Sequence, residues 1–304
     1  MNDHSILIFI QKVREFLEEL QKDADIGFSL RNLFNKSDQL YKEIPGVRRR
    51  IRRLARTINV PSAKLTIQGF GRTQVKVGEK LLTMSDWQTQ SVRDLFFYFL
   101  SVDKPMTKEQ IGSVFWPEIE EPSRLKMRFK NDIYRLRRAV GSDIILYEND
   151  LYSFNRTSDY EYDVEAFGGL LFQSRLAKNP NVRIELLQKS VNLVHGPLLE
   201  DIYTIWVEPE RERLKQVFLA ALLELADLLK NTNQVYEALN TYQQAIDYDP
   251  TFESAYLLAM KLYAQLNDRS NTLRLYDAYT EMMKQELDLP PSAEIEAVFK
   301  RLMH

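Results

Sequence analysis

Residues 121–141 read EPSRLKMRFKNDIYRLRRAVG, and their spacing is that of an amphipathic helix. At about 100° per residue, four apolar side chains fall on one side and form a stripe suited to face a protein core. These side chains are Phe129, Ile133, Leu136 and Val140. Ser123 is the expected N-cap and Gly141 the expected stop, so the pattern predicts a short, well-bounded helix over 123–140.

The opposite side of this predicted helix is strongly basic. Asp132 is its only acid, whereas a solvated surface helix usually mixes both signs at i,i+4 spacing. Arg and Asn are also the side chains that pair bidentately with guanine and adenine edges in the major groove. We therefore predict a DNA-recognition helix, with an ordinary solvated charged face as the alternative. The expected base or near-base contacts are Arg124, Arg128, Asn131, Arg135 and Arg138; Met127 and Tyr134 are candidates for a thymine methyl or a phosphate, and Lys126 and Lys130 for phosphates.

The segments before this helix change from a strand pattern to a helical one. The run KLTIQGFGRTQVKVGEKLLTM (64–84) alternates with period two and predicts short strands that turn at 69–71 and 78–79. Residues 87–100 then have helical spacing, and Thr107 is the expected N-cap of a second helix that ends at the next proline. Aromatic side chains recur beside aliphatic ones in both helices, so we expect core positions rather than base-stacking platforms. They are Trp87, Phe96, Phe97, Phe99, Phe115 and Trp116.

After the basic helix, two alternating runs flank Asn149 and Asp150 and predict a β-hairpin. Strands, two helices, a basic helix and a hairpin in this order are typical of a winged helix-turn-helix, whose third helix enters the major groove. Its second helix lies against the DNA backbone, so Thr107 and Lys108 are expected phosphate contacts. The hairpin tip carries two acids and no Arg, and Arg156 just after the hairpin is the expected phosphate contact there.

The charge is unevenly distributed along the 304 residues, although the formal net charge is only −2. Residues 48–63 hold six Arg and no acid, while residues 159–304 hold 14 Lys or Arg against 23 Asp or Glu, a balance of −9. This asymmetry indicates a local nucleic-acid footprint on a chain whose remainder meets something else. We predict three parts: a helical connector with a basic segment over 1–63, a winged helix-turn-helix over 64–158 and a helical domain over 159–304.

The connector is the least informative part of the sequence. Residues 4–22 and 29–41 have helical spacing, but no pattern in them indicates a function. In GVRRRIRRLART (46–57), the arginines between Arg48 and Arg56 surround a few apolar residues. The segment could be a hinge helix that adds phosphate contacts, or a basic hinge that only aids solubility.

Beyond residue 160 the pattern is helical throughout. Two helices are expected to begin near Asp163 and Asn181. Units 219–252 and 253–286 then align with a period of 34, which is the period of tetratricopeptide helix pairs. Such pairs bury their apolar sides only by stacking on one another, so we expect a small superhelix with a groove. Aligned positions include Leu222 with Tyr256, Leu225 with Ala259, Ala226 with Met260, Leu229 with Tyr263, Tyr242 with Tyr276 and Ala245 with Tyr279.

None of the usual motifs of an enzyme occurs in the sequence. Cys is absent, and there is neither a G-x-x-x-x-G-K-[ST] nor a G-x-G-x-x-G motif, so we expect no catalysis and no cofactor. His4, His195 and His304 lack metal-ligand spacing, and His195 is expected to interact with a helix C-terminus instead. No apolar run approaches the length of a membrane span, and the start lacks a signal peptide, so a cytoplasmic location is expected.

Residues 65–154 resemble the response-regulator type of DNA-binding domain, with a leading small sheet, found in SARP-like bacterial transcriptional activators. The segments that carry the resemblance are LTIQGFGRTQV, SVRDLFFYFL, YRLRRAVG and LYENDLYSF. The region that follows resembles the bacterial transcriptional activation domain of the same proteins, most clearly in IWVEPERERLKQVFLAALLELADLL. The two halves occur in the order found in that family, which makes the resemblance more specific than either half alone.

The resemblance implies a mainly α-helical fold with a small β part, and an activator in the bacterial nucleoid that binds direct repeats in double-stranded promoter DNA. It also implies that the helical repeats, and the acidic turn formed by Glu118, Glu120 and Glu121, contact RNA polymerase or a second protomer of a homodimer. The main alternative is a tetratricopeptide scaffold that docks peptides, on which the basic helix is ordinary surface. Another alternative is that the chain is the output part of a larger, signal-sensing regulator.

Overall fold

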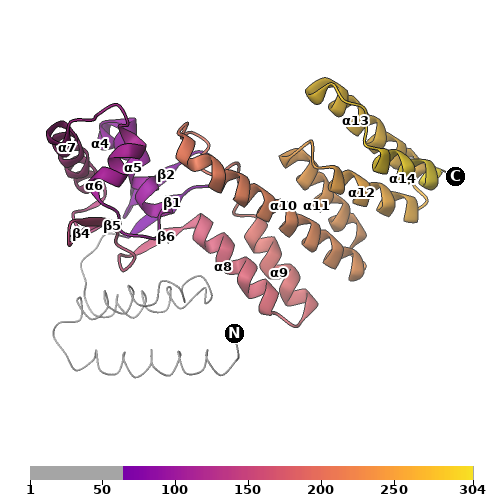
Figure 1. Cartoon of the computed structure of the whole chain (residues 1–304). Coiled ribbons are helices and arrows are strands. Elements are labelled where there is room, and N and C mark those ends of the chain that lie inside the picture. The colour runs from indigo at the N-terminus through magenta and orange to yellow at the C-terminus, as the bar shows by residue number, and fades with distance from the viewer. Residues whose placement is uncertain (1–63, 304) are drawn as a thin grey trace. The chain divides into compact units, whose positions relative to one another are not determined.

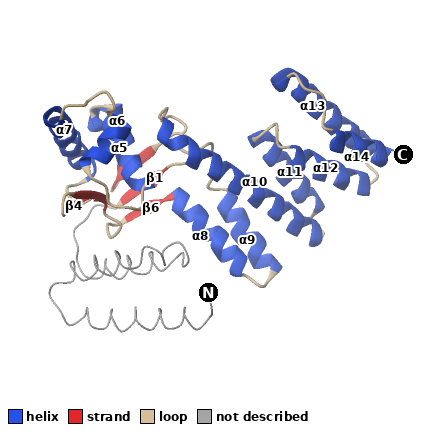
Figure 2. Ribbon diagram, in the orientation of Figure 1, coloured by secondary structure: helices blue, strands red, loops and turns tan. Residues whose placement is uncertain are grey.

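The computed structural model describes residues 64–303, which form many helices and a few short strands (Figure 1, Figure 2). The helical connector and the basic segment predicted for residues 1–63 lie outside the described residues. The first ten elements are β1 (Leu65–Gln68), β2 (Gln74–Val77), β3 (Lys80–Leu81), α4 (Met84–Trp87), α5 (Gln90–Ser101), α6 (Lys108–Phe115), α7 (Pro122–Val140), β4 (Ile145–Glu148), β5 (Leu151–Phe154) and β6 (Tyr160–Tyr162). The remaining ones are α8 (Asp163–Leu176), α9 (Pro180–Val191), the 3-10 helix η1 (Ile205–Val207), α10 (Glu208–Asn231), α11 (Val235–Tyr248), α12 (Glu253–Gln265), α13 (Arg269–Leu287) and α14 (Ala293–Met303). The predicted fold class, mainly α with a small β part, is confirmed.

Four of the strands form one sheet in the order β3-β2-β1-β6. β2 and β3 pair antiparallel, with Lys76 opposite Leu81, and the turn between them contains Gly78 at a φ of +59°. Along β1, Leu65 and Ile67 are buried and alternate with more exposed residues, as expected for a strand with one face on a core. The strands and turns predicted from the period-two pattern are confirmed.

β6 corrects the expectation that the chain is helical throughout beyond residue 160. Tyr160 and Tyr162 are buried, and Glu161 between them is exposed. This alternation has the period of a strand, and aromatic residues favour the extended conformation. The helical pattern therefore begins only at Asp163, the first residue of α8.

The helix predicted over 87–100 is also corrected, because α4 ends at Trp87 and α5 begins only at Gln90. Gln88 between them has a φ of +67°, which interrupts the helical dihedral angles. The Oγ1 atom of Thr89 then accepts a hydrogen bond from the N–H of Val92 at 3.3 Å and caps the new helix. The capping side chain sets the helix start, which apolar spacing alone placed three residues too early.

Thr107 is the N-cap of α6, as predicted. Its side chain accepts a hydrogen bond from the N–H of Gln110 at 3.2 Å. The side chain of Gln110 in turn accepts one from the N–H of Thr107 at 2.9 Å. This reciprocal pair is a capping box, which satisfies two backbone donors that a helix start leaves free.

Ser123, in contrast, is not the N-cap of α7. The helix begins at Pro122 and its N-cap is Glu121, so the bounds are 122–140 rather than 123–140. Proline suits the first helical position because its φ is already helical and its missing N–H would have no partner there. Gly141 ends the helix, as predicted, with a φ of +114° and a hydrogen bond from its N–H to the carbonyl of Arg137 at 2.9 Å.

The described residues form two compact units. The winged unit comprises residues 64–65 and 76–160, and the helical unit comprises residues 66–75 and 161–303. The boundary predicted at residue 158 stays a prediction.

The core of the winged unit is aromatic. Phe96 contacts Trp87, Phe97 and Phe154, with ring centroids 5.4, 5.3 and 6.1 Å away. Five of the six aromatic residues expected in the core are buried, namely Trp87, Phe96, Phe97, Phe99 and Trp116; Phe115 is half-buried and packs edge-on against Tyr98. The expected core position is confirmed for the five buried residues, and α5 and α6 both pack against α7.

The β4–β5 hairpin completes the winged unit. Asn149 and Asp150 have φ angles of +52° and +62°, which a two-residue I′ turn requires, and Glu148 pairs with Leu151 across the turn. The predicted hairpin is confirmed. Met106, in the loop between α5 and α6, exchanges two backbone hydrogen bonds with Tyr152 of β5, at 2.9 and 2.7 Å.

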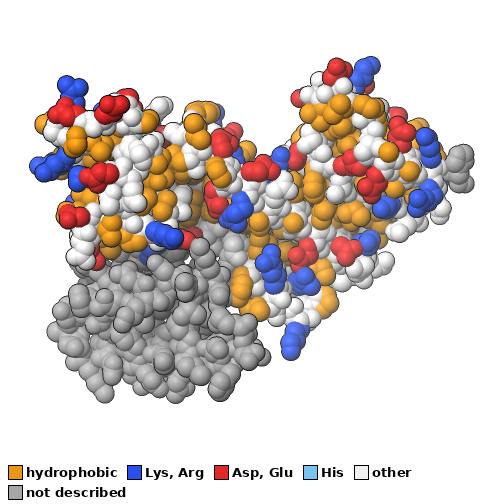
Figure 3. Space-filling view, viewed as in Figure 1, with side chains coloured by type: hydrophobic (Ala, Val, Ile, Leu, Met, Phe, Trp, Pro, Cys, Tyr) orange, Lys and Arg blue, Asp and Glu red, His pale blue; other side chains and the backbone are white. Residues whose placement is uncertain are grey.

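The helical unit contains α8 to α14. Figure 1 shows these helices one after another, and α10 packs with α11 and α12 with α13 as two successive pairs. Most of the aligned positions of the predicted repeat are buried: Leu222, Leu225, Ala226, Leu229, Tyr242, Ala245, Tyr256, Ala259, Met260 and Tyr279; Tyr263 and Tyr276 are half-buried. Figure 3 shows apolar, acidic and basic side chains interspersed on one face of this repeat region. The helix pairs and their buried positions agree with the predicted period of 34.

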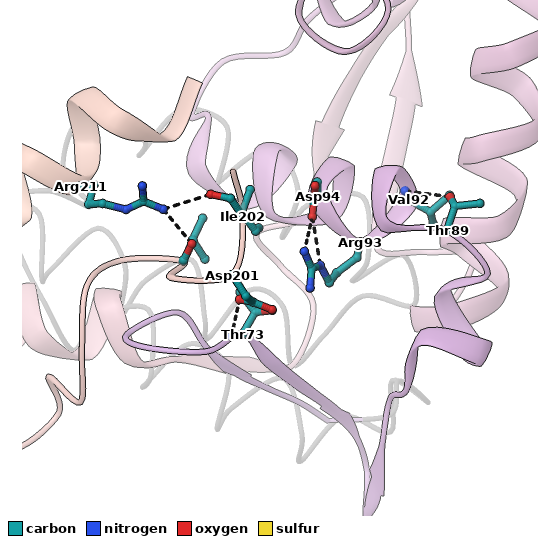
Figure 4. A network of polar contacts seen from close by, with 9 residues as sticks. Thr73, Thr89, Val92, Arg93, Asp94, Asp201, Ile202 and Arg211 are labelled. Carbon is teal, nitrogen blue, oxygen red and sulfur yellow. Dashed lines mark hydrogen bonds and ion pairs between the residues drawn. The ribbon is translucent and has the colours of Figure 1, made fainter. Parts of the chain in front are cut away.

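The turn between β1 and β2 belongs to the helical unit. Asp163 accepts hydrogen bonds from the N–H groups of Gly69 and Phe70 at 2.7 and 3.0 Å, and Asp201 accepts from the N–H and the hydroxyl of Thr73 at 2.9 and 3.0 Å. Figure 4 shows the Thr73–Asp201 contact. It also shows the guanidinium of Arg211 directed at Ile202, the residue that follows Asp201. The carboxylate of Asp163 thus binds the first end of this turn, and the carboxylate of Asp201 binds the second end.

Candidate nucleic-acid interface

The helix α7 has one buried face and one exposed face. The predicted apolar stripe is confirmed, because all four of its residues are buried. Leu125 and Asp132 are buried with them. The opposite face carries seven of the predicted contact residues in exposed positions: Arg124, Lys126, Met127, Lys130, Asn131, Tyr134 and Arg138.

Five of these exposed residues form a single row along the helix. Arg124, Met127, Asn131, Tyr134 and Arg138 follow one another at intervals of three or four residues, which places them on one side of an α-helix. Met127 is 67% and Tyr134 is 66% exposed, although both are large and partly apolar. Exposed apolar side chains gathered with Arg and Asn are typical of a binding surface. Lys126 and Lys130 lie on the flank of this row.

Arg128 and Arg135 are placed differently from that row. Nε of Arg128 donates to Oδ2 of Asp132 at 3.1 Å, and Nη1 of Arg135 donates to Oδ1 of the same carboxylate at 3.2 Å. The guanidinium of Arg128 also lies 5.7 Å from the ring centroid of Trp116, within the range of a cation–π contact. Both arginines are therefore held at the edge of the exposed row, each with part of its side chain still accessible.

Arg124 forms an ion pair that is more exposed, and therefore weaker, than those of Arg128 and Arg135 with Asp132. Its Nε lies 2.9 Å from the carboxylate of Glu121, the N-cap of the helix, and both side chains are largely exposed. Exposed pairs of this kind are worth about 0–1 kcal/mol, so Arg124 can exchange this partner for another anion. Figure 3 shows basic and acidic side chains side by side on the surface around α7.

The two predicted phosphate contacts of α6 lie at the start of that helix. Lys108 pairs with Glu109 at 2.7 Å, and this hydrogen bond raises the pKa of Lys108 and lowers the pKa of Glu109. The hydroxyl of Thr107 accepts the capping bond described above, and its hydrogen bond to the Glu109 carboxylate also lowers the pKa of Glu109. Both residues are half-buried.

Arg156 is turned into the winged unit. Its Nη2 donates to the carbonyls of Leu100 at 2.7 Å and Val102 at 3.4 Å, and its guanidinium lies 5.3 Å from the centroid of the Phe154 ring. The side chain is only 17% exposed. Arg156 thus ties the end of α5 to the end of the hairpin, and its role as a phosphate contact stays a prediction.

Two functional features of α7 were not expected from the sequence. Asp132 is fully buried and joins two candidate contact residues. Asp132 lies four residues after Arg128 and three before Arg135, which is the spacing at which helical side chains meet. The sequence therefore contained the pattern that indicates these contacts. Arg137 donates from Nη2 to the carbonyl of Ile145 at 2.8 Å and fixes the hairpin against the helix, which its charge alone did not indicate.

The described residues were also compared with what a membrane span and a metal site require. Among the helices of residues 64–303, none is both long and apolar enough to cross a membrane. In the same part of the chain, no three acidic or histidine side chains are grouped as metal ligands. His195 is exposed and follows the last residue of α9, Val191, by four residues. Its predicted interaction with a helix end stays a prediction.

The comparisons with known proteins concern the helical unit and the fold. Residues 162–303 match the family model of the bacterial transcriptional activator domain. This match supports a bacterial transcriptional activator as the class of protein.

Among solved structures, the chain is similar to Mycobacterium tuberculosis EmbR in complex with a low-affinity phosphopeptide. The TM-score is 0.64 at 15% sequence identity, so the likeness concerns the fold. The matched region covers 80% of this chain and 65% of that chain. None of the curated proteins compared with the chain matches it.

Proposed function

We propose that this protein is a sequence-specific DNA-binding transcriptional activator that reads the major groove with α7. The observation that carries the proposal is the exposed row of Arg124, Met127, Asn131, Tyr134 and Arg138, which lies opposite the buried stripe of the same helix. A helix of this kind, supported by two helices and followed by a hairpin, is the arrangement that presents a recognition helix to the major groove.

The contacts of this helix divide by chemistry. Asn131 and the arginines of the row, together with Arg128 and Arg135, offer paired donors that suit adenine and guanine edges. Met127 and Tyr134 offer apolar surface to thymine methyl groups. Lys126 and Lys130 on the flank, and Thr107 and Lys108 on α6, supply phosphate contacts, which position the helix without reading sequence.

Activation requires a second contact, which we assign to the helical unit and to the acidic turn before α7. Glu118, Glu120 and Glu121 are exposed, and the region 159–304 has the acidic balance of −9. Acidic surfaces do not bind DNA, so they are free for RNA polymerase or for a second protomer bound to an adjacent repeat of a promoter. A reconstituted transcription assay tests this assignment. Deletion of the helical repeats that leaves promoter activation intact would contradict it.

The DNA-binding proposal is tested with two matched variants of the full chain. Asn131→Ala combined with Arg138→Ala removes two members of the exposed row and should relax recognition at the positions they read, at a cost of about 1–3 kcal/mol each. Lys261→Ala removes an exposed cation of α12 in the helical unit and should leave DNA binding unchanged.

The alternative, a peptide-docking scaffold, makes the opposite prediction for the same variants. If the protein were such a scaffold, the Asn131→Ala and Arg138→Ala double variant would bind DNA no differently from the Lys261→Ala variant. Selection of bound sequences from a random pool also gives the spacing of the half-sites. That spacing reports whether one protomer or two occupy a promoter.

A further inference from the structure

We propose that Asp132 is a positioning residue that presets Arg128 and Arg135 for base recognition and thereby sets the sequence specificity of α7. Asp132 is fully buried, yet its two oxygens accept hydrogen bonds from two partly exposed arginines. The assignment rests on the proposed function, because it concerns how the same helix discriminates between DNA sequences.

The first step is the fixed geometry of the two guanidinium groups. Arg side chains have many rotamers, and ordering them on binding opposes association. In the free protein, Arg128 is already held between the carboxylate of Asp132 and the ring of Trp116, and Arg135 by the other oxygen of Asp132. Groups held in this way lose less conformational freedom when DNA binds.

The second step is the choice of donors that remain for DNA. Arg128 donates to Asp132 through Nε, which leaves its two terminal Nη groups as a pair of parallel donors. Arg135 donates through Nη1, which leaves the Nε and Nη2 edge. Bidentate binding to O6 and N7 of a guanine needs one such pair. The carboxylate therefore fixes which edge of each arginine faces a base.

The third step concerns charge. A carboxylate between two guanidinium groups cancels one of two positive charges, so the cluster attracts phosphates less strongly than two free arginines would. Asp132 thus lowers the affinity for any DNA while it favours the sequence that fits the preset arginines. If Asp132 served only the packing of the core, its substitution would change the affinity for all DNA sequences by the same factor.

The test compares the full-length protein with Asp132→Asn and with Asp143→Asn. The first substitution keeps the shape of the side chain and removes its charge. The second makes the same chemical change at an exposed acid just after α7. The duplex selected by the unsubstituted protein from a random pool, and random-sequence duplex, are both titrated at several salt concentrations between about 50 and 200 mM.

For Asp132→Asn we expect the ratio of the two affinities to fall at least about tenfold, because two bidentate contacts lose their alignment. We expect its affinity for random duplex to be equal or higher, with a slope of log K against log salt that is steeper by about 0.9. Asp143→Asn should keep the unsubstituted ratio. An unchanged ratio in Asp132→Asn, or a parallel loss of both affinities, overturns the proposal. Failure of the unsubstituted protein to select any sequence instead overturns the proposed function.

A second measurement needs no variant and covers the case in which Asp132→Asn does not fold. In the unsubstituted protein without DNA, solvent exchange of the Arg128 Nε–H, followed by NMR, should be at least about tenfold slower than that of the Arg138 Nε–H. Arg138 is exposed, whereas Arg128 donates to a buried acceptor. Equal exchange rates would show that Arg128 is not held, and would overturn the proposal.

Discussion

Arg128 and Asp132 lie one turn apart on α7 and are joined by a hydrogen bond of 3.1 Å, although Asp132 is fully buried and Arg128 is 42% exposed. The only acid of a basic helix therefore lies at the boundary between its core face and its exposed row. A buried carboxylate without its cationic partners would be strongly unfavourable, so the acid and the arginines depend on each other. This pair connects the packing of the winged unit to the surface proposed to read DNA.

Base contacts and phosphate contacts of α7 should respond differently to substitution. Asn131→Ala should cost about 1–3 kcal/mol on the selected sequence and relax one base position, because an amide pairs with one adenine edge. Lys126→Ala or Lys130→Ala should weaken all sequences about equally and reduce the salt slope by about one. Affinities for a set of single-base variants of the selected site distinguish the two classes. Identical profiles for Asn131→Ala and Lys130→Ala would be inconsistent with the assignment.

Gly69 should not tolerate a side chain, because a Cβ there would lie 2.6 Å from the ring of Tyr162. Gly69→Ala should lower the free energy of unfolding by about 1–3 kcal/mol, as in other overpacked cores. Gly168→Ala is the matched control: its Cβ would meet nothing within 4 Å, and Ala is favoured over Gly inside a helix. It should stabilise by about 0.5–1 kcal/mol. Denaturant unfolding of both variants measures the difference, and equal destabilisation would refute the packing argument.

Asp163 should make stability depend on pH. Burial raises its pKa above the ordinary value near 3.8, against the opposing effect of the N–H donors of Phe70, Gly69 and Val164. Between the ordinary and the raised value, the folded protein binds a proton that the unfolded chain does not bind. Stability contributed by this group therefore increases as pH falls through the raised pKa, and the increase is complete below the ordinary value.

Asp163→Asn removes this contribution. As pH falls from 7 towards about 4, the unsubstituted protein should therefore become more stable relative to the variant. Urea unfolding at several pH values measures that difference. A difference that is constant with pH, or that shrinks towards low pH, would argue against a buried carboxylate with a raised pKa.

Arg211 organises the loop before α10. Its guanidinium donates to the carbonyls of Leu198, Leu199 and Ile202 at 2.9, 2.8 and 3.1 Å. Arg211→Ala leaves these acceptors without their donor and should destabilise the protein by roughly 1–3 kcal/mol. Arg213→Ala, two residues further on, removes a more exposed arginine paired with Glu210 and should cost less than about 1 kcal/mol. Thermal unfolding of the two variants provides the comparison, in which an equal loss would contradict this role.

The fold of the winged unit could largely be predicted from local pattern. The apolar stripe of α7, the cap at Thr107 and the hairpin at Asn149 follow from periodicity and turn chemistry, which act over a few residues. The errors also have local causes: Thr89 and Pro122 each set a helix start that apolar spacing misplaced. β6 was missed because three alternating residues next to a long helix give a weak strand signal.

The candidate site could be predicted less completely. Periodicity identified the exposed row of α7, because exposure follows from the position of the buried stripe. It did not identify that Asp132 holds Arg128 and Arg135, or that Arg156 faces the end of α5, because those contacts depend on how elements pack. The bonds of Asp163 and Asp201 to the turn at 69–73 join residues about 90 to 130 positions apart, which local pattern does not report.

The most direct test of the proposed function is the affinity of the purified chain for random-sequence duplex DNA between about 50 and 200 mM salt, followed by selection of bound sequences. We predict a steep decrease of affinity with salt and enrichment of a repeated half-site. Absence of binding at the lowest salt, or salt-dependent binding with no enriched sequence, would contradict sequence-specific recognition by α7.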